Sequence, residues 1–117
     1  MEAVREHCAS RPAATGEYPF GPQVRVYKVV GKMFALVPDE GAAATLTLKC
    51  DPALAEILRQ NFADVIPGYH LNKRHWNTVA LGAAVPDQQV EEMVRHSYGL
   101  VQSSLSKKAR SAIIGGV

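Results

Sequence analysis

The sequence is poor in cysteine and has no long apolar run. These two features argue against a secreted disulfide-rich domain and against a membrane-spanning protein. Cys8 and Cys50 are the only cysteines among 117 residues, whereas small secreted domains held by disulfides usually carry more. No apolar stretch approaches the roughly 20 residues that cross a bilayer. The opening "MEAVREHCASRP" carries charges where a secretory leader would have its apolar core. We therefore expect a cytoplasmic protein without a membrane segment.

A strong excess of one charge sign is also missing. Thirteen Lys and Arg against 11 Asp and Glu give a net charge of +2, which is too small to indicate a nucleic-acid partner by itself. The hydrophobic content of 47% and charged content of 21% are typical of globular proteins. A length of 117 residues suits one folding unit. We expect residues 1–117 to form a single domain, as a monomer or a weak dimer.

The first half of the sequence predicts a helix followed by three strands. Residues 1–10 have apolar side chains at helical spacing, and a proline then ends the helix. The stretch "AATGEYPFGP" is rich in glycine and proline, which predicts a loop. Next, "QVRVYKVVGKMFALVP" predicts two strands joined by a type II′ turn at Gly31 and Lys32, with Phe34 and Leu36 on one face. The alternating "TLTLKC" predicts the third strand.

The second half predicts a helix, two strands and a long helix. The first helix begins after the N-cap Asp51, runs to about Ala63 and carries an apolar stripe that includes Ile57. A short strand and residues 76–81 supply the strands, and "VPDQQVEEMVRHSYGLVQSSL" predicts the last helix before a basic tail. Because the strands are grouped, the predicted fold class is α+β. It is a single antiparallel sheet in the order α-β-β-β-α-β-β-α with helices packed against it.

One short segment, "HLNKRHWNTVAL", gathers most of the polar chemistry. Cations and amide donors suit phosphate oxygens, and an exposed aromatic ring can stack on a base. Lysines on the predicted strands extend the same surface, and a second basic group follows the last helix. The candidate nucleic-acid-binding residues are His70, Asn72, Lys73, Arg74, His75, Trp76, Lys28, Lys32 and Lys49. Asn72 and Asn77 are expected to hold the turn and the start of the strand by hydrogen bonds to nearby backbone.

The stretch "LTLKCDPALAEILRQNFADVIPGYHLNKRHWNTVAL", followed by "VPDQQVEEMVRHSYGLV", resembles the MmcQ/YjbR family of small bacterial proteins. The resemblance runs from about Val26 to the C-terminus and is weak before Gln23. It implies the α-β-β-β-α-β-β-α fold, related in shape to type III secretion chaperones. It also implies DNA binding by a "double-wing" arrangement in which hairpins contact the duplex. DNA is therefore the favoured partner.

Two alternatives compete with the nucleic-acid hypothesis. In the first, Trp76 belongs to the core and the cations form an ordinary solvated surface. In the second, the protein binds another protein or a peptide, because the resemblance to secretion chaperones implies a sheet with an available edge or groove. Lys28 and Lys49 would then protect exposed edge strands from unwanted pairing.

We expect no catalysis, no metal site and no cofactor. The cysteines form no CxxC pair, and the two cations between His70 and His75 would repel a metal ion. His96 is expected to pair with Glu92 one turn earlier on the last helix. No G-x-S-x-G, P-loop or dinucleotide-binding motif is present. The remaining catalytic arrangements are a cysteine beside a histidine and a His70 base oriented by Asp64, and the spacing places neither.

Overall fold

The computed structural model describes residues 2–38, 45–68, 71–81 and 85–115. Its elements are α1 (Glu2–Ala9), β1 (Ala14–Glu17), β2 (Val24–Val29), β3 (Lys32–Pro38), β4 (Thr45–Lys49), α2 (Pro52–Asn61), β5 (Val65–Pro67), β6 (Trp76–Ala80), α3 (Asp87–Ser104) and α4 (Lys107–Gly115). The α+β class and the predicted order of elements are confirmed, with one strand and one helix added.

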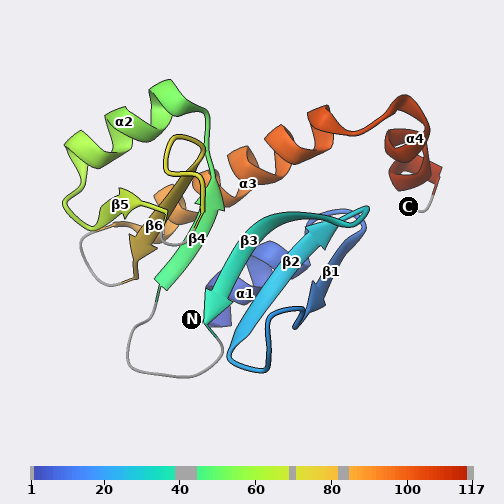
Figure 1. Ribbon diagram of the computed structural model, residues 1–117, viewed down its shortest axis with the longest axis horizontal. Coiled ribbons are helices and arrows are strands. Elements are labelled where there is room, and N and C mark those ends of the chain that lie inside the picture. Colours follow the sequence, from blue (N-terminus) through green and yellow to red (C-terminus); the bar gives the residue numbers. More distant parts are fainter. Residues whose placement is uncertain (1, 39–44, 69–70, 82–84, 116–117) are drawn as a thin grey trace.

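The six strands form one antiparallel sheet in the order β1-β2-β3-β4-β6-β5 (Figure 1). After β4 the chain passes through α2 and β5 before β6 returns to pair with β4. The edges of the sheet are therefore β1 and β5. Lys28 and Lys49 lie on β2 and β4, which have a neighbour on each side. The hypothesis that these two lysines protect edge strands is wrong.

The two added elements lie where the sequence pattern is weak. β1 falls in the segment predicted to be a loop, and most of its residues are exposed. It pairs with β2 through backbone hydrogen bonds, which need no apolar alternation. α4 occupies the predicted basic tail. The Ser106 hydroxyl accepts a hydrogen bond from the Ala109 amide at 3.1 Å, as an N-cap serine does.

The β2–β3 hairpin differs from the prediction in its turn and in its register. The two loop residues are Val30 and Gly31, with φ of 48° and 78°, so the turn is type I′ and one residue earlier than expected. A β-bulge at Phe34 follows, because Tyr27 pairs with Ala35 while the next residue pairs with Met33. The bulge turns Phe34 toward the helices, so it does not share a face with Leu36.

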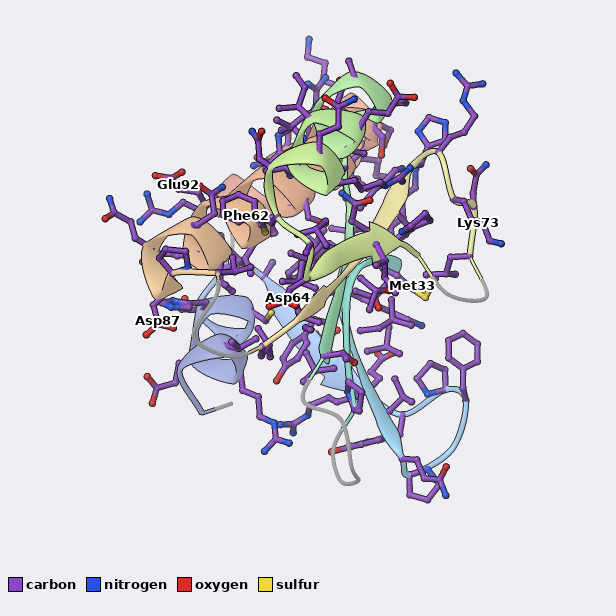
Figure 2. All side chains as sticks on the ribbon, turned by 90° about the vertical axis from the view of Figure 1, so that its left-hand side faces the viewer. Met33, Phe62, Asp64, Lys73, Asp87 and Glu92 are labelled. Atoms are coloured by element: carbon purple, nitrogen blue, oxygen red, sulfur yellow. The ribbon has the colours of Figure 1, made fainter. Side chains whose placement is uncertain are left out.

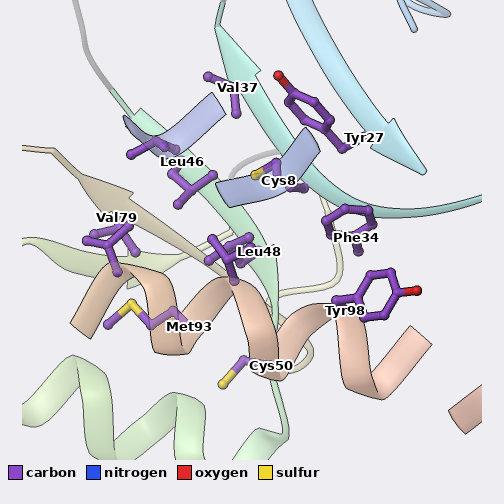
Figure 3. Close-up of a cluster of buried hydrophobic side chains, with 14 of the residues drawn as sticks. Cys8, Tyr27, Phe34, Val37, Leu46, Leu48, Cys50, Val79, Met93 and Tyr98 are labelled. Atoms are coloured by element: carbon purple, nitrogen blue, oxygen red, sulfur yellow. The ribbon is translucent and has the colours of Figure 1, made fainter. Parts of the chain in front are cut away.

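Helices α1, α2 and α3 lie on one face of the sheet (Figure 2). The core forms between them and the sheet, where the Phe34 ring meets the Tyr98 ring edge-on at 5.4 Å (Figure 3). The buried Ser97 hydroxyl donates to the Phe34 carbonyl at 2.5 Å and accepts from the Lys49 amide at 2.9 Å, which ties α3 to two strands. Among the described residues, no helix covers the opposite face, which we call the open face.

Candidate nucleic-acid interface

The candidate site is built around residues 71–75, which we call the basic loop. Inside it, the Asn72 side-chain oxygen accepts a hydrogen bond from the Arg74 amide at 3.0 Å, and the Asn72 carbonyl accepts from the His75 amide at 3.1 Å. This is the self-contained turn that asparagine favours. The prediction that Asn72 holds the turn through nearby backbone is confirmed.

Arg59 of α2 fastens the basic loop to the rest of the fold. Its Nε donates to the Asn77 side-chain oxygen at 2.7 Å, and its Nη2 donates to the carbonyls of Lys73 and Trp76. The Asn77 amide nitrogen reaches the Ala55 carbonyl at 3.4 Å. Asn77 thus bonds to α2, and the predicted bond to nearby backbone is wrong. Arg59 thus holds three groups of residues 73–77.

Sequence reasoning missed Arg59 because it assigned Ile57, and not Ala55, to the buried face of α2. The other predicted members of the apolar stripe do pack against the core, namely Leu54, Leu58 and Phe62. Ile57, assigned to that stripe, is 51% exposed, while Ala55 and Leu58 are buried. Ala55 and Arg59 are four residues apart, so they share one side of the helix. The signal in the sequence was a cation next to the buried face of α2. Its hydrogen-bond partners could not be predicted, because they lie 14 to 18 residues further along the chain.

The base of the loop is closed by backbone contacts. The Gly68 amide donates to the Trp76 carbonyl and the Cys50 amide donates to the His75 carbonyl, both at 2.7 Å. A Cβ on Gly68 would lie 2.6 Å from the Trp76 Cβ, so only glycine fits this close approach. Trp76 is buried, with 9% of its surface exposed. Its burial agrees with the core alternative and leaves little of the ring for stacking on a base.

The side chains of Asn72, Lys73 and Arg74 are exposed and His75 is half-buried. His70 lies outside the described residues. Antiparallel pairing brings other cations to the same end of the sheet, since Lys49 is the register partner of Trp76 and Lys32 begins the adjacent strand β3. β4 and β6 are neighbours, so Lys49 is about 5 Å of sheet from the start of β6, whereas Lys32 lies three residues beyond the last β3–β4 pair, toward the end of α3 (Figure 1).

We call Lys32, Lys49, Lys73 and Arg74 the basic end. The Lys32 ammonium also donates to the Ser104 hydroxyl at 3.4 Å, which places the start of α4 beside it. The second basic group, Lys107, Lys108 and Arg110, follows Ser104 closely in the chain and is therefore near Lys32 in space. Lys28 lies at the same end of the sheet, but its Nζ pairs with the Glu17 carboxylate at 3.1 Å. This pairing offsets the charge of Lys28.

Two exposed acidic residues of α3 lie on the other side of the molecule. Figure 2 shows Lys73 on the loop at one side, with Glu92 and Asp87 of α3 at the opposite side. Lys73 and Arg74 therefore lie away from the two carboxylates of α3. The field of such a molecule orients an approaching polyanion.

The two thiols are poor nucleophiles. Burial raises the pKa of Cys50 to about 11 and that of Cys8 to about 12, so both are protonated at neutral pH. His96 does not pair with Glu92 as predicted; its Nε2 accepts a hydrogen bond from the Asp51 amide at 3.2 Å. Within the described ranges, no three His, Cys, Asp or Glu side chains are grouped as metal ligands. In the same ranges, no helix combines the length and apolarity needed to span a membrane.

The fold and the fixed basic loop define a small α+β protein whose single sheet is covered by helices on one face. The YjbR family model matches residues 9–100. Uncharacterized protein YjbR of Escherichia coli K12 is 34% identical over 114 residues, 97% of each chain, and YbdF of E. coli O157:H7 is 31% identical over 85% of this chain and 81% of its own. The chain belongs to the YjbR family, as the motif resemblance predicted.

A solved relative supports the same conclusion. The crystal structure of Deinococcus radiodurans protein DR2400 matches with a TM-score of 0.86 at 37% identity, covering 94% of this chain and 84% of that one. A Pseudomonas syringae protein of 23% identity matches with a TM-score of 0.68, over 81% of this chain and 92% of its own. The second likeness extends the fold to a more distant sequence.

Proposed function

We propose that this protein binds nucleic acid, preferably duplex DNA, through phosphate contacts made by the basic end. The observation that carries the proposal is the fixed backbone of the basic loop, which holds Lys73 and Arg74 in solvent beside Lys49. Ordering flexible side chains and loops costs affinity, and a loop ordered before binding avoids part of that cost.

The chemistry of the basic end favours phosphate over base recognition. Its members are Lys and Arg side chains, and Trp76 is too buried to serve as a stacking platform. Phosphate contacts position a protein on DNA but carry no sequence information directly. We therefore propose binding with strong salt dependence and weak sequence preference.

The test is a fluorescence-anisotropy titration of labelled duplex DNA at low salt. We expect the wild-type protein to bind and Lys73→Ala/Arg74→Ala to bind at least about tenfold more weakly, since each cation releases counterions from DNA. A circular-dichroism spectrum of the double variant checks that the fold is retained. Absence of wild-type binding at 50 mM salt would remove the proposal.

The open face supports a second candidate function, the binding of an apolar peptide segment. A groove of about 670 Å³ runs over this face, with Leu36 in its floor and the exposed Phe20 and Ile66 at its margins. Strand addition at the β5 edge is less suitable, since β5 has three residues and ends in Pro67, which lacks an amide donor. We therefore propose the groove, rather than the β5 edge, as the surface for an apolar peptide.

This second candidate has its own test. A peptide with leucine and phenylalanine flanked by glutamates should shift the NMR resonances of Leu36, Thr47 and Thr78, which line the groove. The same peptide with serine at the apolar positions is the control. Equal shifts from both peptides, or none from either, would exclude apolar peptide binding at the open face.

A further inference from the structure

A separate cavity of about 270 Å³ lies between α2 and α3, on the helix side of the sheet. Leu48 and Val79 form its floor, and Leu54, Leu58 and Met93 form its walls. A cavity of about 150 Å³ with similar apolar walls accepts a benzene ring. This cavity therefore has room for one or two rings. Atoms that line an empty cavity lack packing partners, so an occupant would stabilise the fold.

Lys49 also borders the cavity. Side chains alternate along β4, so the Lys49 side chain lies on the open face with Thr47, and the rest of the inner wall carries no ionised group at neutral pH. Cys50 lines it and lies on the side of α3 that faces α2 (Figure 3). Burial raises the pKa of this thiol to about 11, so Cys50 behaves as a small neutral side chain. The Asn77 oxygen that borders the cavity is already bonded to Arg59. The deep part of the cavity is thus suited to an apolar body.

The mouth of the cavity is polar and lies along one side of α3. Gln89, Glu92 and His96 line it and are spaced by three and four residues, so they share one helix face. His96 is held by the hydrogen bond from the Asp51 amide. Glu92 is exposed and has no hydrogen-bond or ion-pair partner among the described residues. Its carboxylate is an acceptor and a negative charge beside an apolar cavity.

We propose that this cavity binds a small amphipathic amine or amidine of one or two rings, with its apolar body between α2 and α3 and its cationic head against Glu92. A carboxylate head would meet the charge of Glu92 and be repelled. Glu92 and Lys73 lie on opposite sides of the molecule (Figure 2). The head-group contact therefore lies on the side opposite the basic loop, and Lys49 is the one member of the basic end that borders the cavity.

Three probes of matched shape test the proposal: benzamidine, benzamide and benzoate. They share one ring and differ in the charge of the head group. Each is titrated to millimolar concentration while the methyl resonances of Leu54, Leu58 and Met93 are followed by NMR. We expect benzamidine to bind most tightly, benzamide more weakly and benzoate least. Unshifted methyl resonances with all three probes, or benzoate binding as well as benzamidine, would overturn the proposal.

Two variants locate the contacts. Glu92→Gln should weaken benzamidine binding about 3- to 5-fold, as expected for a solvent-exposed ion pair, and leave benzamide unchanged. Glu91→Gln is the matched control, because Glu91 pairs with Arg95 at 2.5 Å and does not line the cavity. Leu54→Phe should fill part of the cavity and weaken all ring binding. Equal benzamidine affinity in wild type and Glu92→Gln would contradict the assigned head-group contact.

Discussion

Arg59 lies outside the basic end but fixes the backbone of the basic loop. One guanidinium supplies hydrogen bonds to the Asn77 side chain and to the carbonyls of Lys73 and Trp76. Asn77 is 3% exposed, so its oxygen has no access to bulk water if Arg59 is removed. A buried acceptor without a partner costs free energy, which makes Arg59 a positioning residue for the basic loop.

Arg59→Ala should therefore lower the free energy of unfolding by about 2 kcal/mol, because it leaves the Asn77 oxygen and two loop carbonyls without this donor. Urea denaturation followed by tryptophan fluorescence measures the change. The control is Arg95→Ala, which removes an exposed pair with Glu91 and should cost less than about 1 kcal/mol. Equal losses in the two variants would show that Arg59 does not anchor the loop.

Gly68 is the second residue on which the loop depends. Gly68→Ala would place a methyl group 2.6 Å from the Trp76 Cβ, and we expect a loss of about 1–3 kcal/mol together with a shifted tryptophan emission. Gly99→Ala is the control, since nothing lies within 4 Å of that added methyl group in the helix α3. It should be neutral or stabilising by up to about 1 kcal/mol. If Gly68→Ala were as stable as Gly99→Ala or more stable, the close contact between Gly68 and Trp76 would be contradicted.

At the scale of elements, the β2–β3 hairpin carries an unusual turn. Val30 has a φ of 48°, a left-handed conformation that a β-branched residue adopts at a cost. The type I′ turn favours Asn followed by Gly, and Gly31 already fills the second position. The strain lies beside Lys32 of the basic end.

Val30→Asn should raise the free energy of unfolding by about 1 kcal/mol, because asparagine tolerates this backbone conformation. Val30→Ala is the control and should gain less, since alanine also disfavours a positive φ. Thermal unfolding by circular dichroism compares the two. A loss of stability in Val30→Asn would mean that the valine side chain has a packing role that outweighs its strain.

The elements differ in how far local pattern determines them. Asp51 and Pro52 begin α2 as predicted, and the Asp51 carboxylate accepts from the Leu54 amide at 3.4 Å, because capping is a local interaction. β1 and the Phe34 bulge depend on partner strands, which no local pattern records. The basic loop could be predicted from its motif. The role of Arg59 could not, because it depends on α2 and the loop lying close together in space.

At the scale of the whole molecule, the basic loop, the acidic residues of α3 and the apolar groove lie on different sides. Cations gather at one end of the sheet, acidic residues of α3 lie opposite, and the open face carries an apolar groove. The core between sheet and helices contains both thiols in the neutral form. This arrangement keeps the proposed phosphate-binding surface away from the negative charge of α3.

The buried thiols predict a loss of stability at alkaline pH. Burial raises the folded-state pKa of Cys8 to about 12 and of Cys50 to about 11, from an ordinary value of 9.0. Above pH 9 the folded state holds more protons than the unfolded state, so the free energy of unfolding falls as pH rises. Urea denaturation between pH 8 and 10.5 measures the slope.

Cys8→Ala/Cys50→Ala is less stable at pH 8 because it leaves cavities, but its pH slope should be flatter. Burial also raises the pKa of Tyr27 and Tyr98, and this contribution remains in both proteins. Identical slopes in the two proteins would contradict the assignment to the thiols.

The most direct test of the central claim is the salt dependence of DNA affinity in two matched variants. Arg74→Ala removes an exposed cation from the basic end, and Arg95→Ala removes one from α3. A cation that neutralises a phosphate contributes about 0.9 to the slope of log K against log salt. We expect Arg74→Ala to lower the slope by about that amount and Arg95→Ala to leave it unchanged. An unchanged slope in Arg74→Ala, with wild-type affinity, would show that the basic end does not contact phosphate.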